Sequence, residues 1–239
     1  MSNEIKFKVN YKDYPEYMFA MIAAYLPKNK GNDLRRVAGS VIFRHEDQYG
    51  NTYKNGVLHS YNDNPAVINR DSQLWYRNGK LHRDGNLPAI ISGDYQVWYK
   101  NGKRHREGDL PAYIKGDEEV WYKNNKCHRE GDLPAVINGP YQAWYKNDNL
   151  HRDGDLPAVI NGQYQAWYKN DNLHRDGDLP AIIDRDYYVW YKNGLRHRDC
   201  NKPAFISGHL KLWYKDGILQ KDGDLPTVIS REYQVCEFL

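Results

Sequence analysis

Histidine, arginine and acidic residues recur at fixed positions along the chain, and their types could support metal binding or acid–base chemistry. Seven of the nine His lie 23 residues apart, and six of these are followed by Arg and then by Asp or Glu. The regularly spaced residues after the first, His59, are His82, His105, His128, His151, His174 and His197. If each repeat supplies two neighbouring strands, equivalent His lie roughly 9–10 Å apart. Zinc needs ligand atoms at about 2 Å, so two such His can hardly share one ion.

The Arg-acid pairs that follow these His, such as Arg106 and Glu107, are also repeated rather than single. A catalytic carboxylate is normally one group placed against one specific partner. We therefore interpret the His and the Arg-acid pairs as parts of the architecture. We expect no catalytic residue, no bound metal and no cofactor, so the sequence favours a protein that is not an enzyme.

A second candidate set combines Tyr with the basic residue that follows it. Aromatic columns flanked by positive charge can bind single-stranded nucleic acid through base stacking and phosphate contacts, and anionic lipid is another possible ligand. Sheet packing or contact with a protein explains the same column without either ligand, and we favour that interpretation. The candidate binding residues are Tyr76, Tyr99, Tyr122, Tyr145, Tyr168, Tyr191, Lys100, Lys123, Lys146 and Lys169.

These residues belong to a tandem repeat, because the 7 Trp of the chain all follow the same 23-residue step. They are Trp75, Trp98, Trp121, Trp144, Trp167, Trp190 and Trp213. The period never slips, so no insertion separates the units. Thr52 and Cys236 occupy the Trp position at the two ends, which is typical of terminal units in a stacked array. We expect the Trp and the His to form a structural ladder.

Each unit carries two turn signals between short β-favouring runs. The pair Asn101-Gly102 indicates a two-residue hairpin, since both central residues of that turn need a positive φ. This turn places Tyr99 opposite Arg104 and Trp98 opposite His105. A second turn centred on Lys115-Gly116 would place Leu110 opposite Trp121, so we expect Trp, Leu, Ala and Ile to form the buried ladder.

The segment Gly108-Asp109-Leu110-Pro111 must interrupt the strand. His105 and Leu110 are an odd number of residues apart, whereas a regular strand alternates with a period of two. Gly tolerates bulge geometry and Pro cannot donate to a central ladder. We therefore predict a bulge or corner there in every unit, stabilised by side-chain to backbone bonds from Asp109, Asp132, Asp155 and Asp178.

The predicted fold is all-β: an elongated, twisted antiparallel meander of about eight repeated hairpins. A closed β-solenoid with a corner at each Leu-Pro is the alternative. We divide the chain into an N-terminal cap, residues 1–40, and the repeat array, residues 41–239. A helix near residues 15–26 would cover the first strand, which otherwise leaves a free sheet edge. A partner-binding or interfacial helix is the other interpretation of this segment.

Composition further narrows the classes of protein to which the chain can belong. The net charge is +3 with 27% charged residues, a weakly basic balance that does not establish nucleic-acid or membrane binding. Cys127, Cys200 and Cys236 share no metal or disulfide spacing, which indicates free thiols in a reducing compartment. No stretch is apolar enough to span a bilayer, and the start is not a secretory signal. These features favour a cytoplasmic protein.

The run from Tyr95 through Trp98, Asn101-Gly102 and His105 to Gly108 resembles the MORN repeat. The resemblance covers the chain from about residue 49 onward and implies stacked β-hairpins in an elongated twisted sheet. The chain departs from the family where a Gly usually follows the His, since Arg106, Arg129, Arg152 and Arg175 stand there. A Leu-Pro-Ala segment is also added, so the chain looks like the variant found in bacterial and giant-virus repeat proteins.

The resemblance implies a scaffold, because MORN-type arrays mainly mediate protein contacts or membrane association. We expect a protein partner or self-association and no small-molecule substrate. The alternative is a peripheral module that binds anionic lipid or single-stranded nucleic acid through Tyr and Lys. The Asn-, Lys- and Tyr-rich composition would suit an AT-rich genome such as that of a large DNA virus. A viral structural or host-interaction protein in the host cytoplasm or the virion is one version of the scaffold hypothesis.

Overall fold

The computed structural model describes residues 44–220, 228–230 and 234–235. The expected N-terminal cap, residues 1–40, and its helix near residues 15–26 lie outside the described residues. The chain divides into two compact units, residues 1–103 and residues 104–239.

The described part of the first unit, from residue 44 onward, is built from short antiparallel strands. Its N-terminal sheet has the order β1-β2-β3, formed by β1 (Arg44–Glu46), β2 (Thr52–Lys54) and β3 (Val57–Leu58). The main sheet of this unit consists of β4 (Val67–Ile68), β5 (Ser72–Leu74), β8 (Ile90–Ser92) and β9 (Tyr95–Val97). A short hairpin comprises β6 (Tyr76–Arg77) and β7 (Lys80–Leu81). The remaining strands are β10 (Tyr99–Lys100) and β11 (Lys103–Arg104), and the unit boundary falls within β11.

The second unit repeats one arrangement of two hairpins. Its main sheet contains β12 (Tyr113–Lys115), β13 (Glu118–Val120), β16 (Val136–Asn138), β17 (Tyr141–Ala143), β20 (Val159–Asn161), β21 (Tyr164–Ala166), β24 (Ile182–Asp184), β25 (Tyr187–Val189), β28 (Phe205–Ser207), β29 (Leu210–Leu212), β32 (Val228–Ile229) and β33 (Gln234–Val235). The short hairpins pair β14 (Tyr122–Lys123) with β15 (Lys126–Cys127), β18 (Tyr145–Lys146) with β19 (Asn149–Leu150), β22 (Tyr168–Lys169) with β23 (Asn172–Leu173), β26 (Tyr191–Lys192) with β27 (Leu195–Arg196), and β30 (Tyr214–Lys215) with β31 (Ile218–Leu219).

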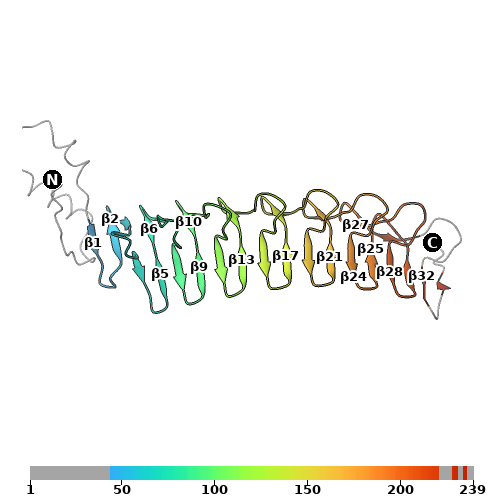
Figure 1. The fold of residues 1–239 in the computed structure, drawn as a ribbon, viewed down its shortest axis with the longest axis horizontal. Coiled ribbons are helices and arrows are strands. Elements are labelled where there is room, and N and C mark those ends of the chain that lie inside the picture. Colours follow the sequence, from blue (N-terminus) through green and yellow to red (C-terminus); the bar gives the residue numbers. More distant parts are fainter. Residues whose placement is uncertain (1–43, 221–227, 231–233, 236–239) are drawn as a thin grey trace, which may run out of the picture. The chain divides into compact units, whose positions relative to one another are not determined.

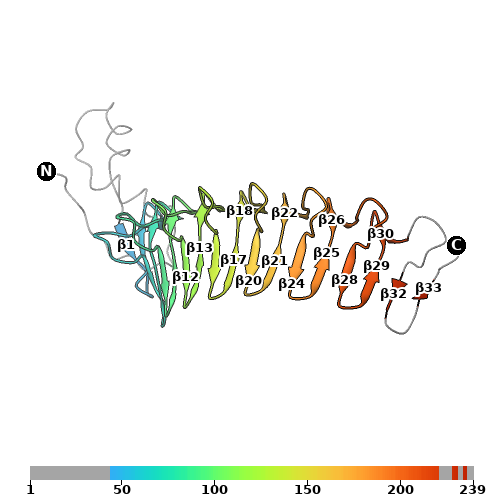
Figure 2. The same cartoon turned by 45° about the vertical axis from the view of Figure 1, so that its right-hand side comes forward.

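The main strands of the second unit follow one another in chain order, and every pair is antiparallel (Figure 1). The short hairpins lie along one end of these strands, as Figure 2 shows for β18, β22 and β26. The predicted all-β meander of repeated hairpins is confirmed. The sheet is open, so the closed solenoid is wrong. Among the described residues every element is a strand.

The short hairpins adopt the register that the Asn-Gly signal predicted. Tyr122 pairs with Cys127 and Lys123 with Lys126, which leaves Asn124 and Asn125 in the turn. Both turn residues have positive φ, 54° and 73°, as a type I′ turn requires. The His128 amide donates to the Trp121 carbonyl at 3.1 Å, so the expected pairing of Trp with His is also confirmed.

The predicted turn of the main hairpins was wrong by one residue. Lys115 pairs with Glu118, so the two central residues are Gly116 and Asp117 rather than Lys115 and Gly116. Gly116 has a φ of +54°, and a type II′ turn needs such a residue at its first central position. Because the shift moves the facing strand by two residues, Leu110 does not oppose Trp121.

The buried ladder contains Trp and Ala, and the expectation that Leu and Ile belong to it was wrong: Ile68 is 59% exposed, and the other repeated Ile are half-buried. The seven repeated Trp are 3–8% exposed, and the Ala of each Pro-Ala pair, from Ala66 to Ala204, is fully buried. The Leu column, in contrast, is 43–45% exposed from Leu87 to Leu179. These Leu lie in the loop that leads from each short hairpin back to the main sheet, for example residues 151–158 after Leu150. The predicted corner is therefore confirmed, and it turns Leu toward solvent.

The main turns offer a test of backbone strain, because Arg185 occupies a position held by Gly in neighbouring units. Its φ is +50°, which costs a residue with a side chain roughly 1–2 kcal/mol. We expect Arg185→Gly to raise the free energy of unfolding by about 0.5–1 kcal/mol, after the entropic cost of Gly. Urea denaturation followed by circular dichroism measures the change.

The matched control is Gly162→Arg, one unit earlier. Gly162 has a φ of +60° and no heavy atom within 4 Å of an added Cβ, so only backbone strain opposes the substitution. This variant should be destabilised. If Arg185→Gly and Gly162→Arg both raised the free energy of unfolding, or both lowered it, the assignment of backbone strain to Arg185 would be contradicted.

Candidate functional site

Each long strand of the second unit presents two different faces. Along β17 and β18, one side of the strand carries Tyr141, Ala143 and Tyr145. The other side carries Gln142, Trp144 and Lys146. Tyr141 and Tyr145 pack against a buried cluster that contains Ala143 and Val159. The opposite side of the strand is covered at Trp144 by Arg152 from the connecting loop. We call the first side the Tyr face and the second side the Trp face.

On the Trp face, one Arg of each 23-residue repeat makes several polar contacts. The guanidinium of Arg152 lies 3.8 Å from the centre of the Trp144 ring. Its Nε and Nη2 donate to the two carboxylate oxygens of Asp132 at 2.6 and 2.8 Å, and its Nη1 donates to the Pro157 carbonyl at 3.1 Å. Asp132 precedes Arg152 by 20 residues, so the pair joins two consecutive 23-residue repeats. Arg83, Arg129, Arg175 and Arg198 repeat the arrangement.

The acidic partners of these Arg had been assigned a different role. Asp109, Asp132, Asp155 and Asp178 were expected to bond the backbone of the corner, whereas each accepts two hydrogen bonds from the Arg of the following unit. Hydrogen bonding to Arg129 is the main reason why the pKa of Asp109 is lowered. Arg198, helped by Lys202, lowers the pKa of Asp178 to about 2.

The repeated His form a second set of bridges. In His151, Nδ1 accepts the amide proton of Asn170 in the next unit at 3.3 Å, and Nε2 lies 2.9 Å from Asp153. This pattern assigns the proton of the neutral ring to Nε2. His82, His174 and His197 make both contacts in the same way. Both ring nitrogens are therefore engaged, and the ladder role expected for His takes the form of inter-unit hydrogen bonds.

A third bridge involves the second residue of the short-hairpin turn. The Asp171 amide donates to the Leu150 carbonyl at 3.0 Å, and the Leu150 amide donates to the Asp171 carboxylate at 2.7 Å. Asp148 binds Cys127 in the same two-point manner. In units with Gly at this position only the backbone bond forms, as for Gly194 and Leu173. The sequence analysis missed this contact, although the replacement of Gly by Asn or Asp is its signal.

The candidate Lys residues lie on the Trp face and have acidic partners. Lys123 pairs with Glu130 at 2.5 Å, and Lys146 pairs with Asp153 at 3.2 Å. Lys169 and Asp176 are 3.7 Å apart. Tyr145 and Lys146 are adjacent residues in one strand, so their side chains point to opposite faces. The structure therefore separates the Tyr and Lys columns that the sequence had grouped together.

The candidate Tyr residues are half-buried on the Tyr face. Tyr145 and Tyr168 flank the buried cluster, together with Tyr141 and Tyr164 from the adjacent main strands. Burial, followed by the nearby Tyr141 hydroxyl, raises the pKa of Tyr145 to about 12. Tyr122 and Tyr191 occupy equivalent positions in β14 and β26, and Tyr76 and Tyr99 do so in the first unit. The Tyr face is thus a column of phenol rings, in which Arg104 stacks on Tyr122 and Arg196 donates to the Tyr191 hydroxyl.

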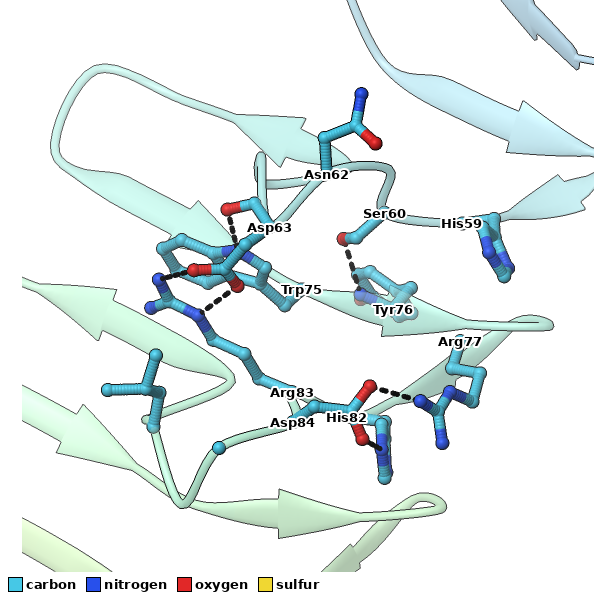
Figure 3. Close-up of a pocket in the computed structure, with 12 residues that line it drawn as sticks. His59, Ser60, Asn62, Asp63, Trp75, Tyr76, Arg77, His82, Arg83 and Asp84 are labelled. Atoms are coloured by element: carbon cyan, nitrogen blue, oxygen red, sulfur yellow. Dashed lines mark hydrogen bonds and ion pairs between the residues drawn. The ribbon is translucent and has the colours of Figure 1, made fainter.

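The first unit contains a hollow of about 450 Å³ on its Trp face (Figure 3). Asp63 accepts two hydrogen bonds from Arg83, both at 2.8 Å, and Asp84 lies between Arg77 and His82. Trp75 Nε1 donates to the Asp63 carbonyl at 3.0 Å. The charged groups that line the hollow are therefore bonded to one another.

Among the described residues, no group of three or more His, Cys, Asp or Glu is arranged to hold a metal ion. Within the same residues, no helix has the length and apolar character needed to cross a membrane. No protein-family model, no curated protein and no solved structure matches the chain.

The Arg on the Trp face should contribute more to stability than the exposed ion pairs. The Arg152 side chain is 12% exposed, whereas Lys146 and Asp153 are 54% and 79% exposed. We expect Arg152→Ala to lower the free energy of unfolding by about 1–2 kcal/mol, because it removes the stacking on Trp144 and the hydrogen bond to the Pro157 carbonyl, while the exposed Asp132 adds little. The control Lys146→Ala should cost less than about 0.5 kcal/mol. Urea denaturation compares the two, and equal losses would contradict the assigned role of Arg152.

Acid should lower the free energy of unfolding of the array, because it protonates the Asp residues that pair with Arg. The pKa values of Asp63, Asp109, Asp132, Asp155 and Asp178 are all lowered from 3.8 in the folded chain. The unfolded chain therefore binds protons more readily, so the stabilisation is present above pH 3.8 and is lost as the pH falls toward 2. The urea midpoint, measured in steps through this window, should fall. Asp178→Asn should make the fall smaller, and a constant midpoint would argue against the mechanism.

Proposed function

We propose that this chain is a non-enzymatic, MORN-like repeat scaffold that binds a protein partner along its Tyr face. The observation that carries the proposal is the contrast between the two faces. On the Trp face, Arg, Asp, His and Lys are engaged with one another and hold consecutive units together. On the Tyr face, aromatic rings with polar tips lie in a column, and such side chains suit contact with another protein.

The saturation of the acid–base groups supports the non-enzymatic part of the proposal. A general base must present a free nitrogen or oxygen to its substrate. In His151 and His174 both ring nitrogens are already bonded, one to the next unit and one to a carboxylate. A scaffold role also agrees with a repeat in which the same contacts recur in every unit.

The second candidate, a module for anionic lipid or single-stranded nucleic acid, receives less support. Binding of either ligand through the Tyr/Lys surface requires positive charge beside the aromatic rings. Lys146 lies on the opposite side of the strand from Tyr145 and contacts Asp153. Self-association through the same face is a version of the scaffold proposal, and so is a viral structural or host-interaction role in the cytoplasm or the virion.

Photo-crosslinking from the two faces tests the scaffold proposal. A benzophenone amino acid replaces Tyr168 on the Tyr face or, as the matched control, Lys169 on the Trp face of the same strand. We expect covalent protein adducts from position 168 and few from position 169 when the full chain is irradiated in cells. Absence of adducts from both positions, or equal adducts from both, would contradict a Tyr-face scaffold.

Vesicle and nucleic-acid binding tests the second candidate. Phosphatidylserine vesicles and polyuridylic acid are each incubated with the full chain at low and high salt. Electrostatic binding weakens steeply as salt rises. We expect no binding to either probe at low salt. Binding at low salt that is lost at high salt, and lost in Lys146→Ala, would favour the lipid or nucleic-acid module over the scaffold.

A further inference from the structure

We propose that the Tyr face of the second unit binds a proline-rich segment in the polyproline II conformation, lying across the strands. This inference rests on the proposed scaffold function and names the chemistry of its partner. Three features of the Tyr face support it: free hydroxyl groups, a regular spacing and an uncharged stretch around Tyr141.

The free hydroxyl groups come from consecutive repeats. Among the residues that the structure describes, the hydroxyls of Tyr141, Tyr145, Tyr164, Tyr168 and Tyr187 have no hydrogen-bonding partner, and none of them is buried. Four of these phenols, Tyr141, Tyr145, Tyr164 and Tyr168, pack around the same buried cluster. Burial raises the pKa of each of these four hydroxyls, so they stay protonated and present hydrogen-bond donors to solvent.

The spacing of the row matches one kind of extended chain. Equivalent Tyr such as Tyr141 on β17 and Tyr164 on β21 are two strand spacings apart in the main sheet, which is about 9.4–9.8 Å at the usual strand spacing. Polyproline II advances about 3.1 Å per residue and repeats every three residues, so one turn is about 9.3 Å long. The mismatch is about 0.1–0.5 Å per repeat and stays below about 1 Å across the two intervals from Tyr141 to Tyr187.

Other peptide conformations fit the spacing less well. A heptad on an α-helix spans about 10.5 Å, so its side chains would lose register by roughly 1.5–2 Å over the same two intervals. A β-strand repeats its side-chain direction every 6.6–6.8 Å or so, which does not match the Tyr spacing. The regular period therefore selects polyproline II among the common extended or helical ligands.

The chemistry of the face also fits this ligand. Polyproline II makes no internal hydrogen bonds, so its carbonyls can accept from the Tyr hydroxyls while its rings pack on the phenol rings. Asn138 and Asn161 pair with Tyr141 on its two sides, so this part of the face is uncharged. A neutral, proline-rich segment loses little hydration of charged groups when it binds there.

Fluorescence anisotropy with labelled peptides tests the inference on the full chain. The probes are proline oligomers of six, nine and twelve residues, with a glycine-serine peptide of twelve residues as the conformational control. We expect affinity to rise with each added turn of proline and the glycine-serine peptide to bind much more weakly. Failure of the longest proline oligomer to bind at millimolar concentration, or equal binding of the glycine-serine peptide, would overturn the inference.

Variants locate the binding to the Tyr face. The double variant Tyr145→Phe/Tyr168→Phe keeps both rings and removes two donors, so it should weaken binding by about tenfold or more. Lys169→Ala, on the opposite face of the same strand, should change affinity less than about twofold. Circular dichroism checks that both proteins are folded. If the crosslinks from position 168 persist but proline oligomers do not bind, the scaffold proposal stands and the polyproline inference is wrong.

Discussion

The architecture depends on the backbone of one Trp in each unit, where the chain passes from the main sheet into the short hairpin. The Trp144 amide donates to the Ala158 carbonyl of the next unit at 2.8 Å, while its carbonyl accepts from the His151 amide at 3.0 Å. The Trp144 backbone therefore forms one hydrogen bond to the next 23-residue repeat and one within its own repeat. Because side chains alternate along the strand, this fixed position also decides that Trp and Tyr point to opposite faces.

The Trp face and the Tyr face consequently have different structural roles. On the Trp face, Arg152 satisfies its guanidinium through Trp144, Asp132 and Pro157, and His151 links its own unit to Asn170. These contacts join neighbouring units and leave few groups free for a ligand. On the Tyr face, Arg196 links the hydroxyls of Tyr191 and Tyr214, whereas the hydroxyls around the cluster of Ala143 and Val159 remain available. A scaffold of this kind separates the surface that holds the array together from the surface that can bind.

The sequence predicted the repeat, the Trp ladder and the register of the short hairpins, because each depends on local signals such as Trp121 or the turn at Asn124. It did not predict contacts that depend on how a loop folds over the sheet. Leu110 became exposed because the turn begins at Gly116, and a shift of one residue in a turn moves its partner strand by two. The pairing of Asp132 with Arg152 across 20 residues likewise requires the path of the loop, which composition and period do not specify.

The segments 141–158 and 164–181 are identical over 18 residues. Every bridge described above reaches only to the adjoining unit, so a copy inserted in frame finds the same neighbours as its template. Whole copies can therefore be added or removed 23 residues at a time, and the length of the array changes without the redesign of a single contact.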